Sequence, residues 1–436
     1  MLQTLSNAFK VPELRKKILW TVLLVAVFRM GSHIPLPGIN SDFLKNLSQS
    51  GGLLGFYDML SGGAFSRSSI LALGVMPYIN ASIIIQLLTV AIPQLEQLSK
   101  EGDTGRKKIQ NATRYVSLGI AFILAYGIFA TISSSGATVG LTAIQKTIVV
   151  FALVVGTTFC MWLGDQLTVK GIGNGTSILI FVNIISRVPA TIASMMTLQQ
   201  AGSASIVEIV LFGVFTVFLL ATILYFSLSE RRIPVQYAGK FASGNSNMVK
   251  SQSTHIPLSI IGSAVLAIIF SMSVMDFPKT IATLFGGVGE SQKEWAKWVL
   301  NNPTSIFNNK SWMYMVLYAV LTIFFNWFYT QITFKPDEMS ENLHKSAGFV
   351  PGVRPGEETT TYFERVLNRL SFIGGILAAV LAVTPVMIQN YTQFQNIAFS
   401  GTGLLIVINV ALDFTRKVES QMVVRHYKGC LLYTSL

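Results

Sequence analysis

Long apolar runs recur along the chain, and charged or turn-forming segments separate them. Several of these runs reach the roughly 20 residues that a helix needs to cross the hydrocarbon core of a membrane. They are not the alternating segments of about 10 residues that are typical of a transmembrane β-barrel. The pattern predicts ten helical spans, at Ile18–Ser32, Met76–Ile92, Tyr115–Ile132, Thr147–Leu167, a fifth that starts with Thr176–Ile185, Ile206–Leu228, Ile256–Met275, Trp312–Phe334, Leu370–Met387 and Ile397–Phe414.

One apolar stretch, Ser61–Gln86, is interrupted in a way that a simple membrane span would not need. Gly62, Gly63, Gly74 and Pro77 stand inside it. Glycine and proline break or kink a helix unless neighbouring protein satisfies the freed backbone groups, so a broken apolar segment in a membrane protein usually lines a cavity. We therefore expect this stretch to line a pore.

The composition agrees with an integral membrane protein. Of 436 residues, 51% are hydrophobic and 12% are charged, and the mean hydropathy is +0.55. An average soluble domain carries roughly 25% charged residues. Met1–Lys17 is polar and basic, and the apolar run after it has no small-residue cleavage site, so we expect no cleavable signal peptide.

The basic residues indicate which ends of the spans face the cytoplasm. The net charge is +12, and Lys and Arg concentrate at the N-terminus, in the tail and in the loops Pro93–Arg114, Glu230–Thr254 and Lys335–Arg369. With ten spans, all of these regions fall on one side, as the positive-inside rule requires of cytoplasmic segments. Both termini are therefore expected in the cytoplasm. Anionic partners at the loops are an alternative reason for the excess charge.

The predicted spans divide evenly around a segment at 188–205, which we expect to be a loose external linker. Five spans on each side give the two halves opposite orientations, which is the pattern of an inverted repeat. The expected division is an N-terminal half at 1–187, the linker at 188–205, a C-terminal half at 206–418 with cytoplasmic loops at 229–255 and 335–369, and a cytoplasmic tail at 419–436.

Cysteine, histidine and charged residues, which usually carry catalysis or ion coupling, do not form a recognisable catalytic or ion-coupling motif in this sequence. The two cysteines, Cys160 and Cys430, form no disulfide framework, and the four histidines lie far apart in the sequence. No nucleophile elbow, H-E-x-x-H or Walker-type motif occurs. Arg29 and Asp165 lie near span ends, whereas ion-coupled transporters usually carry charges inside their spans. We therefore expect no enzyme, no metal site and no cofactor.

Two of the predicted spans instead carry isoleucine and valine on one helix face. Val75, Ile79 and Ile83 follow i, i+4 spacing in the second span, and Ile180 and Ile184 do so in the fifth. Packing against other helices or lipid explains such a face. A hydrophobic constriction that gates by excluding water is the sharper alternative. The spacing alone leaves both open.

Six blocks of sequence, in order along the chain, resemble the SecY family, the central channel-forming subunits of protein translocases. They are FRMGSHIPLPGI at Phe28–Ile39, MLSGGAFSRSSILALGVMPYINASIIIQLL at Met59–Leu88, KEGDTGRKKI at Lys100–Ile109, MWLGDQLTVKGIGNGTSILIF at Met161–Phe181, QSTHIPL at Gln252–Leu258 and KSAGFVPGVRPGEET at Lys345–Thr359. After Gly429 the chain ends in CLLYTSL, where this family continues with a basic tail, so we expect residues 430–436 to be foreign sequence.

The resemblance implies an all-α polytopic membrane fold. Ten transmembrane helices would form two pseudo-symmetric five-helix halves around a central hourglass pore. A re-entrant plug helix at about residues 57–69 would block the closed channel, with Tyr57, Ser61, Gly62, Gly63, Phe65 and Arg67 as plug residues. A ring of bulky apolar side chains at the waist would consist of Val75, Ile79, Thr176, Ile180, Ile269 and Ile406. Thr176 departs from the aliphatic residue that is usual there.

The resemblance also implies a lateral gate and two docking loops. The gate, between the second and seventh spans, would release signal sequences and apolar segments into the lipid bilayer, and its residues are Asn80, Ile83, Gln86 and Ser273. The loops would dock the motor ATPase SecA or the ribosome through Arg231, Arg232, Lys240 and Arg354. Arginine suits such contacts because its planar fork bonds phosphate or carboxylate bidentately.

These expectations amount to a passive protein-conducting channel in the bacterial cytoplasmic membrane. It would pass unfolded secretory polypeptides and release transmembrane segments sideways, while SecA or the ribosome supplies the energy. SecE and SecG would be its partner subunits, and YidC, SecDF and a second copy of the chain are further candidate partners. A secondary transporter of a small solute is the alternative that ten spans and a broken helix suggest. A third class, an intramembrane enzyme, lacks a catalytic pair.

Overall fold

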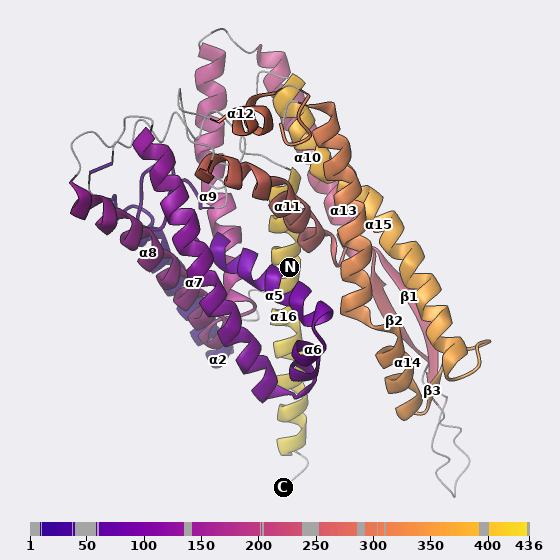
Figure 1. Cartoon of the computed structure of the whole chain (residues 1–436). Coiled ribbons are helices and arrows are strands. Elements are labelled where there is room, and N and C mark those ends of the chain that lie inside the picture. The colour runs from indigo at the N-terminus through magenta and orange to yellow at the C-terminus, as the bar shows by residue number, and fades with distance from the viewer. Residues whose placement is uncertain are drawn as a thin grey trace, which may run out of the picture. The chain divides into compact units, whose positions relative to one another are not determined.

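The computed structural model of the chain is built mainly from α-helices, with one small antiparallel sheet (Figure 1). Contacts divide the chain into two compact units. Unit 1 comprises Met1–Phe212, Asp276–Ser311 and Ile388–Leu436, and unit 2 comprises Gly213–Met275 and Trp312–Met387. The structure describes residues 9, 11–36, 38, 39, 58, 61–134, 142–200, 202, 205–237, 253–285, 293–302, 304–308, 311–391 and 401–433.

Most helices of unit 1 are long and apolar. The helices of this unit are α2 (Pro12–Gly31), α5 (Met76–Ala91), α6 (Pro93–Lys100), α7 (Asp103–Ser134), α8 (Ala143–Lys170), α9 (Gly175–Gln200), α12 (Glu294–Asn301) and α16 (Gly401–Tyr433). α6 and α12 have eight residues each. α2 packs against α8 and α9, α5 packs against α7, and α9 packs against α16. α8 begins with a capping box, in which the Gln145 side chain accepts from the Thr142 backbone N–H over 3.0 Å.

A sharp bend follows the second predicted span. α5 ends at Ala91, Ile92 is extended, and α6 starts at Pro93 at an angle of 102° to α5. Pro93 causes the bend, because a proline disfavours the helical conformation in the residue before it and lacks an N–H for an intrahelical bond. α6 and α7 make much of Pro93–Arg114 helical, where the sequence indicated a charged loop.

Two helices run further than the sequence predicted. α9 continues through Pro189 to Gln200, so the expectation of a loose linker at 188–205 is wrong as far as Gln200. Its last ten residues are TIASMMTLQQ, and six of them are alanine, methionine, leucine or glutamine, which favour helix. This preference offsets the loss of the intrahelical hydrogen bond that Pro189 cannot donate. α16 likewise continues the tenth predicted span to Tyr433, in place of a separate tail.

Unit 2 combines apolar helices with a three-stranded sheet. Its elements are α10 (Ile206–Leu228), which starts in unit 1, β1 (Glu230–Tyr237), β2 (Ser253–Ser259), α11 (Ala264–Phe285), which ends in unit 1, α13 (Trp312–Phe334), α14 (Pro336–Lys345), β3 (Gly348–Phe349) and α15 (Glu357–Tyr391), which also ends in unit 1. The strand order is β2-β1-β3 and both pairings are antiparallel. The sheet therefore joins the two loops that were expected at 229–255 and 335–369.

An apolar core anchors this sheet to the helices of unit 2. Ile233 and Val235 of β1 are buried, while Arg232 and Pro234 beside them are exposed, which is the alternation of a strand with one covered face. They pack with Leu258, Leu343, Val350, Phe363 and Leu367, which come from β2, α14, the residue after β3, and α15. Because β2 continues through Ser259, the seventh span starts at Ala264 rather than at Ile256 as predicted.

Within the described part of the chain, six helices are long and apolar enough to cross a membrane, or up to seven if the bent pair α5–α6 is one span. α10 has the highest mean hydropathy of the six, 2.6, and only 11% of its apolar window is buried. Val207, Leu211 and Val217 of α10 are 71%, 69% and 65% exposed. Such a surface is stable in lipid rather than in water. The protein is a multi-pass membrane protein, and the count of ten spans stays a prediction.

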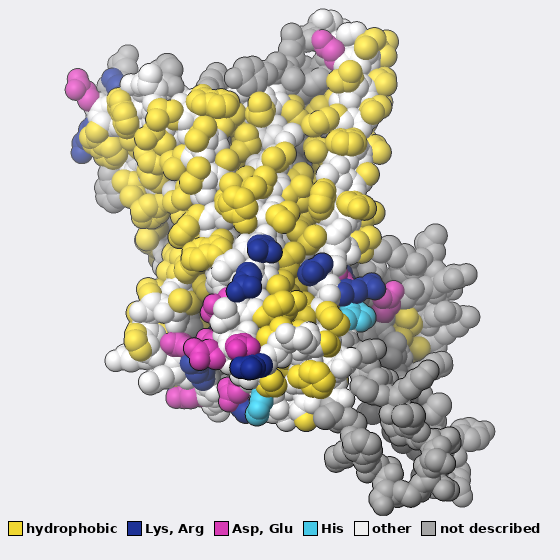
Figure 2. All heavy atoms as spheres, turned by 90° about the vertical axis from the view of Figure 1, so that its right-hand side faces the viewer, with side chains coloured by type: hydrophobic (Ala, Val, Ile, Leu, Met, Phe, Trp, Pro, Cys, Tyr) yellow, Lys and Arg dark blue, Asp and Glu magenta, His cyan; other side chains and the backbone are white. Residues whose placement is uncertain are grey.

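Side chains of different kinds gather in different zones of the surface. On the face in Figure 2, hydrophobic side chains cover the upper part, and Lys, Arg, Asp, Glu and His side chains gather in the lower part. In unit 2, α13 and α15 contribute exposed apolar side chains that include Val320, Phe324, Ile373 and Val380. This separation agrees with apolar spans in lipid and with charged loops in water.

The packing of α15 depends on a glycine without space for a side chain. A Cβ at Gly374 would lie 2.3 Å from the Ile260 carbonyl oxygen. We expect Gly374→Ala to destabilise the protein by about 1–3 kcal/mol, since the backbone at Ile260 must move to admit the methyl group. Gly213→Ala in α10 is the matched control, because nothing lies within 4 Å of its Cβ position. Thermal unfolding in detergent measures both, and equal unfolding temperatures would contradict the close contact.

Candidate functional site

The interrupted stretch that was predicted to line a pore folds as consecutive turns before α5 begins. Residues 61–75 adopt turn conformations around one isolated bridge, and we call them, together with Asp58, the turn segment. Gly62 and Gly63 have φ angles of 67° and 81°, and Ser68 has a φ angle of 52°. Such backbone cannot continue an α-helix. Residues 61–69 of the implied plug helix are therefore turns, whereas Asp58 is helical and Tyr57 lies outside the described residues.

The turn segment is fixed to the residues that follow α2 and to α7 and α8. The Leu36 N–H donates to the Ser68 carbonyl over 2.7 Å, and the Ile70 N–H donates to the Ile34 carbonyl over 3.0 Å. The segment also shares an apolar cluster with those two helices, which consists of Leu36, Phe65, Ala72, Leu73, Ala125, Phe129, Val149, Val150 and Leu153. The turn segment is therefore packed into unit 1 and is not a surface loop.

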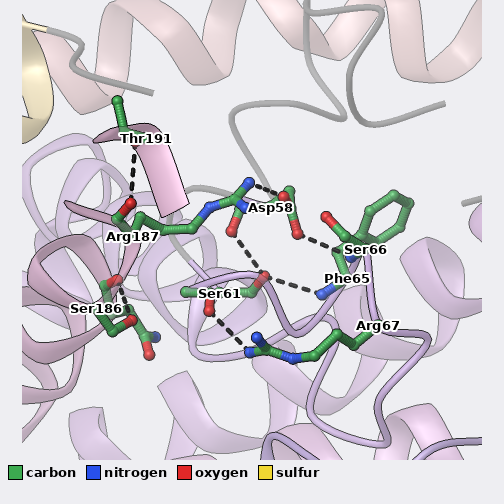
Figure 3. Close-up of polar contacts among 10 residues, drawn as sticks. Asp58, Ser61, Phe65, Ser66, Arg67, Ser186, Arg187 and Thr191 are labelled. Carbon is green, nitrogen blue, oxygen red and sulfur yellow. Dashed lines mark hydrogen bonds and ion pairs between the residues drawn. The ribbon is translucent and has the colours of Figure 1, made fainter. Parts of the chain in front are cut away.

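A fully buried carboxylate organises the first turns of this segment (Figure 3). Asp58 forms an ion pair with Arg187 of α9, and its Oδ1 accepts from the Ser66 backbone N–H over 2.8 Å. Its backbone carbonyl accepts from the Gly63 N–H over 2.9 Å and from the Ser61 hydroxyl over 3.1 Å. A buried carboxylate is stable only when it is paired and hydrogen-bonded, and Asp58 meets both conditions.

Two further arginines lie beside the glycines of the turn segment. Arg67 donates from Nη2 to the Gly62 carbonyl over 3.0 Å, and Arg29 of α2 contacts Asn183 of α9 over 3.5 Å. A Cβ at Gly62 would lie 2.7 Å from Nη1 of Arg29 and 2.8 Å from Oδ1 of Asn183. The positive φ and this close approach both require glycine at position 62.

The residues predicted to form a pore ring lie on several helices, apart from Val75, which immediately precedes α5. Val75, Ile180, Ile269 and Ile406 are buried, and Ile79 and Thr176 are half-buried. α9 carries Thr176 and Ile180 and packs against α16, which carries Ile406. Ile269 lies on α11 in unit 2, and the others lie in unit 1. The ring as a whole stays a prediction.

Thr176 was the predicted ring residue with an unusual side chain. Its backbone N–H donates to Oδ1 of Asn174 over 3.1 Å, so it lies in the capped first turn of α9. A Cβ at Gly164 of α8 would lie 3.1 Å from the Thr176 hydroxyl oxygen. Thr176 therefore lies one turn before Ile180 on α9, close to the backbone of α8.

The predicted lateral-gate residues lie on two helices in different units. Asn80, Ile83 and Gln86 follow one another at intervals of three on α5, and Ser273 lies on α11. Ile83 is buried, whereas Gln86 is exposed and donates to the Ser82 hydroxyl over 3.2 Å. The three α5 residues share one side of the helix, as a gate helix would require.

The predicted docking arginines all lie in unit 2, two on the sheet and one in the turn after it. Arg231 and Arg232 are exposed on β1, opposite Leu258 and Pro257 of β2. Arg354 is exposed in the turn between β3 and α15. Lys240 lies outside the described residues. Exposed guanidinium groups on a folded platform suit recognition of an anionic partner.

Sequence reasoning missed the ion pair between Asp58 and Arg187. The fifth span was predicted to start with Thr176–Ile185, and Arg187, the last residue of the predicted N-terminal half, received no role. Asp58 immediately precedes the motif that begins at Met59 and was also left out. A signal was available, since a cation next to a span needs a partner or water.

Comparison with known proteins gives the family. The SecY family model matches residues 69–415. Protein translocase subunit SecY of Halalkalibacterium halodurans is 39% identical over 98% of this chain and 99% of its own length. A solved structure on how the plug domain of a SecY protein stabilises the closed channel and maintains a membrane seal has a TM-score of 0.65 at 15% identity, with 94% and 92% of the two chains covered. Sec61 in the canine ribosome-channel complex has a TM-score of 0.63 at 16% identity, with 94% and 93% covered. The chain belongs to the SecY family.

Proposed function

We propose that the chain is the channel-forming subunit of a protein translocase in a bacterial cytoplasmic membrane, with both termini in the cytoplasm. It passes unfolded secretory polypeptides across the membrane and releases apolar segments into the lipid. One observation carries the proposal, namely 39% identity over nearly the whole chain to a protein named Protein translocase subunit SecY. We favour this function over transport of a small solute, because no relative reported above carries a transporter's name.

The proposed pore ring consists of Val75, Ile79, Thr176, Ile180, Ile269 and Ile406. A channel for unfolded chains cannot select one side-chain chemistry, so a deformable apolar constriction that dewets when empty suits the task. Polar coordination would make the ring selective and adhesive. Asp58 and residues 61–69 of the turn segment belong to the proposed plug, at about 57–69, that blocks the empty channel. This role follows the plug described for the SecY structure in the comparison.

The proposed lateral gate uses Asn80, Ile83 and Gln86 of α5 together with Ser273 of α11. A signal sequence or an apolar span would leave through it because burial in lipid removes apolar surface from water. The gain is about 25 cal/mol per Å² of apolar surface. Polar residues at the gate would keep it hydrated until an apolar segment displaces the water.

The proposed partners meet the chain at unit 2 and in the membrane. SecA or the ribosome would dock on the sheet and the turn through Arg231, Arg232 and Arg354, with Lys240 in the loop between β1 and β2. The Sec61 structure in the comparison is a ribosome-channel complex, which supports a ribosome as partner. SecE and SecG would complete the channel, and YidC, SecDF or a second copy are further candidates.

Cross-linking to a stalled substrate tests the function. We expect a photoreactive amino acid at Ile79 or Ile406 to form adducts with a secretory polypeptide that is stalled during SecA-driven translocation. The same group at Val217 is the control, because Val217 is 65% exposed on the apolar surface of α10 and should meet lipid. Adducts at Val217 alone, or none at any position with a substrate that is engaged, would contradict the proposal.

A further inference from the structure

We propose that the ion pair between Asp58 and Arg187 is the latch that holds the turn segment in its closed position and sets how readily the channel opens. This inference rests on the proposed function of the turn segment as the plug. It assigns a role to Asp58, which lies in the predicted plug range but is not among the plug residues named there, and to Arg187, which lies outside the predicted plug, ring and gate.

The latch joins the start of the turn segment to a membrane helix. Asp58 is 0% exposed and the Arg187 side chain is 24% exposed, so the pair is largely shielded from water. Arg187 belongs to α9, the helix that also carries Thr176 and Ile180 of the proposed ring. A plug that is paired with this helix is tied directly to the wall that it would close.

Asp58 also shapes the segment that it anchors. Its two carboxylate oxygens have different partners: Oδ2 pairs with Arg187, and Oδ1 accepts from the Ser66 N–H. Its backbone carbonyl holds Gly63 and Ser61. The same side chain therefore fixes the fold of the turns and their attachment to α9, so the turns and the attachment are coupled.

Loss of the Asp58 charge and loss of the Arg187 charge are expected to have unequal effects. The glycines of the turn segment lie against three guanidinium groups, because Arg29 approaches Gly62, and Arg67 and Arg187 approach Gly63 at 3.4 Å and 3.5 Å from its Cβ position. Asp58 is the carboxylate that pairs within this group of cations. Its loss leaves like charges close together in a shielded site, whereas loss of Arg187 removes one of those charges. Neutralising Asp58 should therefore open the channel more than neutralising Arg187.

The test uses the full-length chain with SecE and SecG in proteoliposomes, and compares Asp58→Asn, Arg187→Gln and the double variant. The readouts are ion conductance without substrate and SecA-driven translocation of a precursor with an intact or a defective signal sequence. Asparagine keeps the acceptor for the Ser66 N–H, removes the charge and puts an NH2 donor in place of the oxygen that faces Arg187. Arg114→Gln combined with Asp165→Asn is the matched control, because it removes another ion pair of unit 1, between α7 and α8, at 2.6 Å.

We expect Asp58→Asn to raise the substrate-free conductance by about tenfold or more and to admit precursors with defective signals, since breaking a shielded pair costs far more than an exposed one. Arg187→Gln should give a smaller rise, and the double variant should conduct less than Asp58→Asn, because it leaves fewer unpaired charges. The control pair should conduct like the parent chain.

Folded Asp58→Asn and Arg187→Gln proteins with parental conductance and parental signal dependence would overturn the latch. If Asp58→Asn fails to fold, the comparison of Arg187→Gln with Arg187→Lys decides. Lysine keeps the positive charge, so the Arg187→Lys channel should conduct less than the Arg187→Gln channel. If both variants had the conductance of the parent chain, the proposal would be overturned. A parent chain that translocates no precursor would instead contradict the proposed function, so the two failures are distinguishable.

Discussion

Asparagine at positions 79, 180 and 406 together is expected to make the closed channel leak ions. The three isoleucines lie on α5, α9 and α16, and their replacement puts amide groups where the proposed ring excludes water. Amides hold water in a narrow space that isoleucine side chains would leave dry. We expect the conductance without substrate to rise on the order of tenfold, which corresponds to about 1.4 kcal/mol in the seal. Single-channel recording of the reconstituted complex measures it.

The conservative control for this variant is valine at the same three positions. Valine keeps the surface apolar and removes one methylene group from each side chain, so the seal should persist with a conductance near that of the parent. Both triple variants need the same folded yield in detergent, because Ile180 and Ile406 are buried and polar groups there cost stability. A folded asparagine variant with parental conductance would exclude these residues from the constriction.

The sequence predicted the first and last residues of some helices correctly, because hydropathy alone determines where these helices end. α10 at Ile206–Leu228 and α13 at Trp312–Phe334 coincide with two predicted spans. Charged or proline-containing segments follow both helices, so the apolar pattern and the helix stop together. The sheet was beyond this reasoning, because β3 consists of only Gly348 and Phe349 and pairs with a strand more than 100 residues earlier. Local pattern carries no signal for such a distant pairing.

The site shows the same division between local and distant information. The glycines at 62 and 63 were predicted as interruptions, and the structure gives both of them positive φ angles. The sequence left the packing and constriction explanations of Val75 and Ile79 open, and the family resemblance was needed to favour a ring. Asp58 and Arg187 are 129 residues apart, so their pairing appears only in the fold. Their pairing then explains why both charges are tolerated beside apolar helices.

Reversing the charge at Arg354 is expected to slow partner-driven translocation strongly while the protein stays folded. The turn that carries Arg354 is rigid, since the Thr359 hydroxyl donates to the Arg354 carbonyl over 2.8 Å and the Val353 N–H donates to the Val350 carbonyl over 3.1 Å. Gly356 has a φ angle of 104° and completes the turn. A guanidinium on so fixed a turn binds an anionic partner without a large loss of side-chain and loop entropy. We expect Arg354→Glu to lower the translocation rate by about tenfold or more.

Arg365→Glu is the matched control for Arg354→Glu, because Arg365 is also exposed in unit 2 but lies on α15, where the positive-inside rule explains its charge. It should change the rate much less, although both variants alter the net charge equally. Binding of SecA and of ribosomes to proteoliposomes, measured at two salt concentrations, separates docking from channel opening. If Arg354 makes a docking contact, Arg354→Glu should bind SecA and ribosomes more weakly than the parent chain does. Added salt should then weaken binding by the parent more than binding by the variant. Equal rates and equal salt dependence for the two variants would show that Arg354 contributes only general charge, and docking would then have to rest on Arg231 and Arg232.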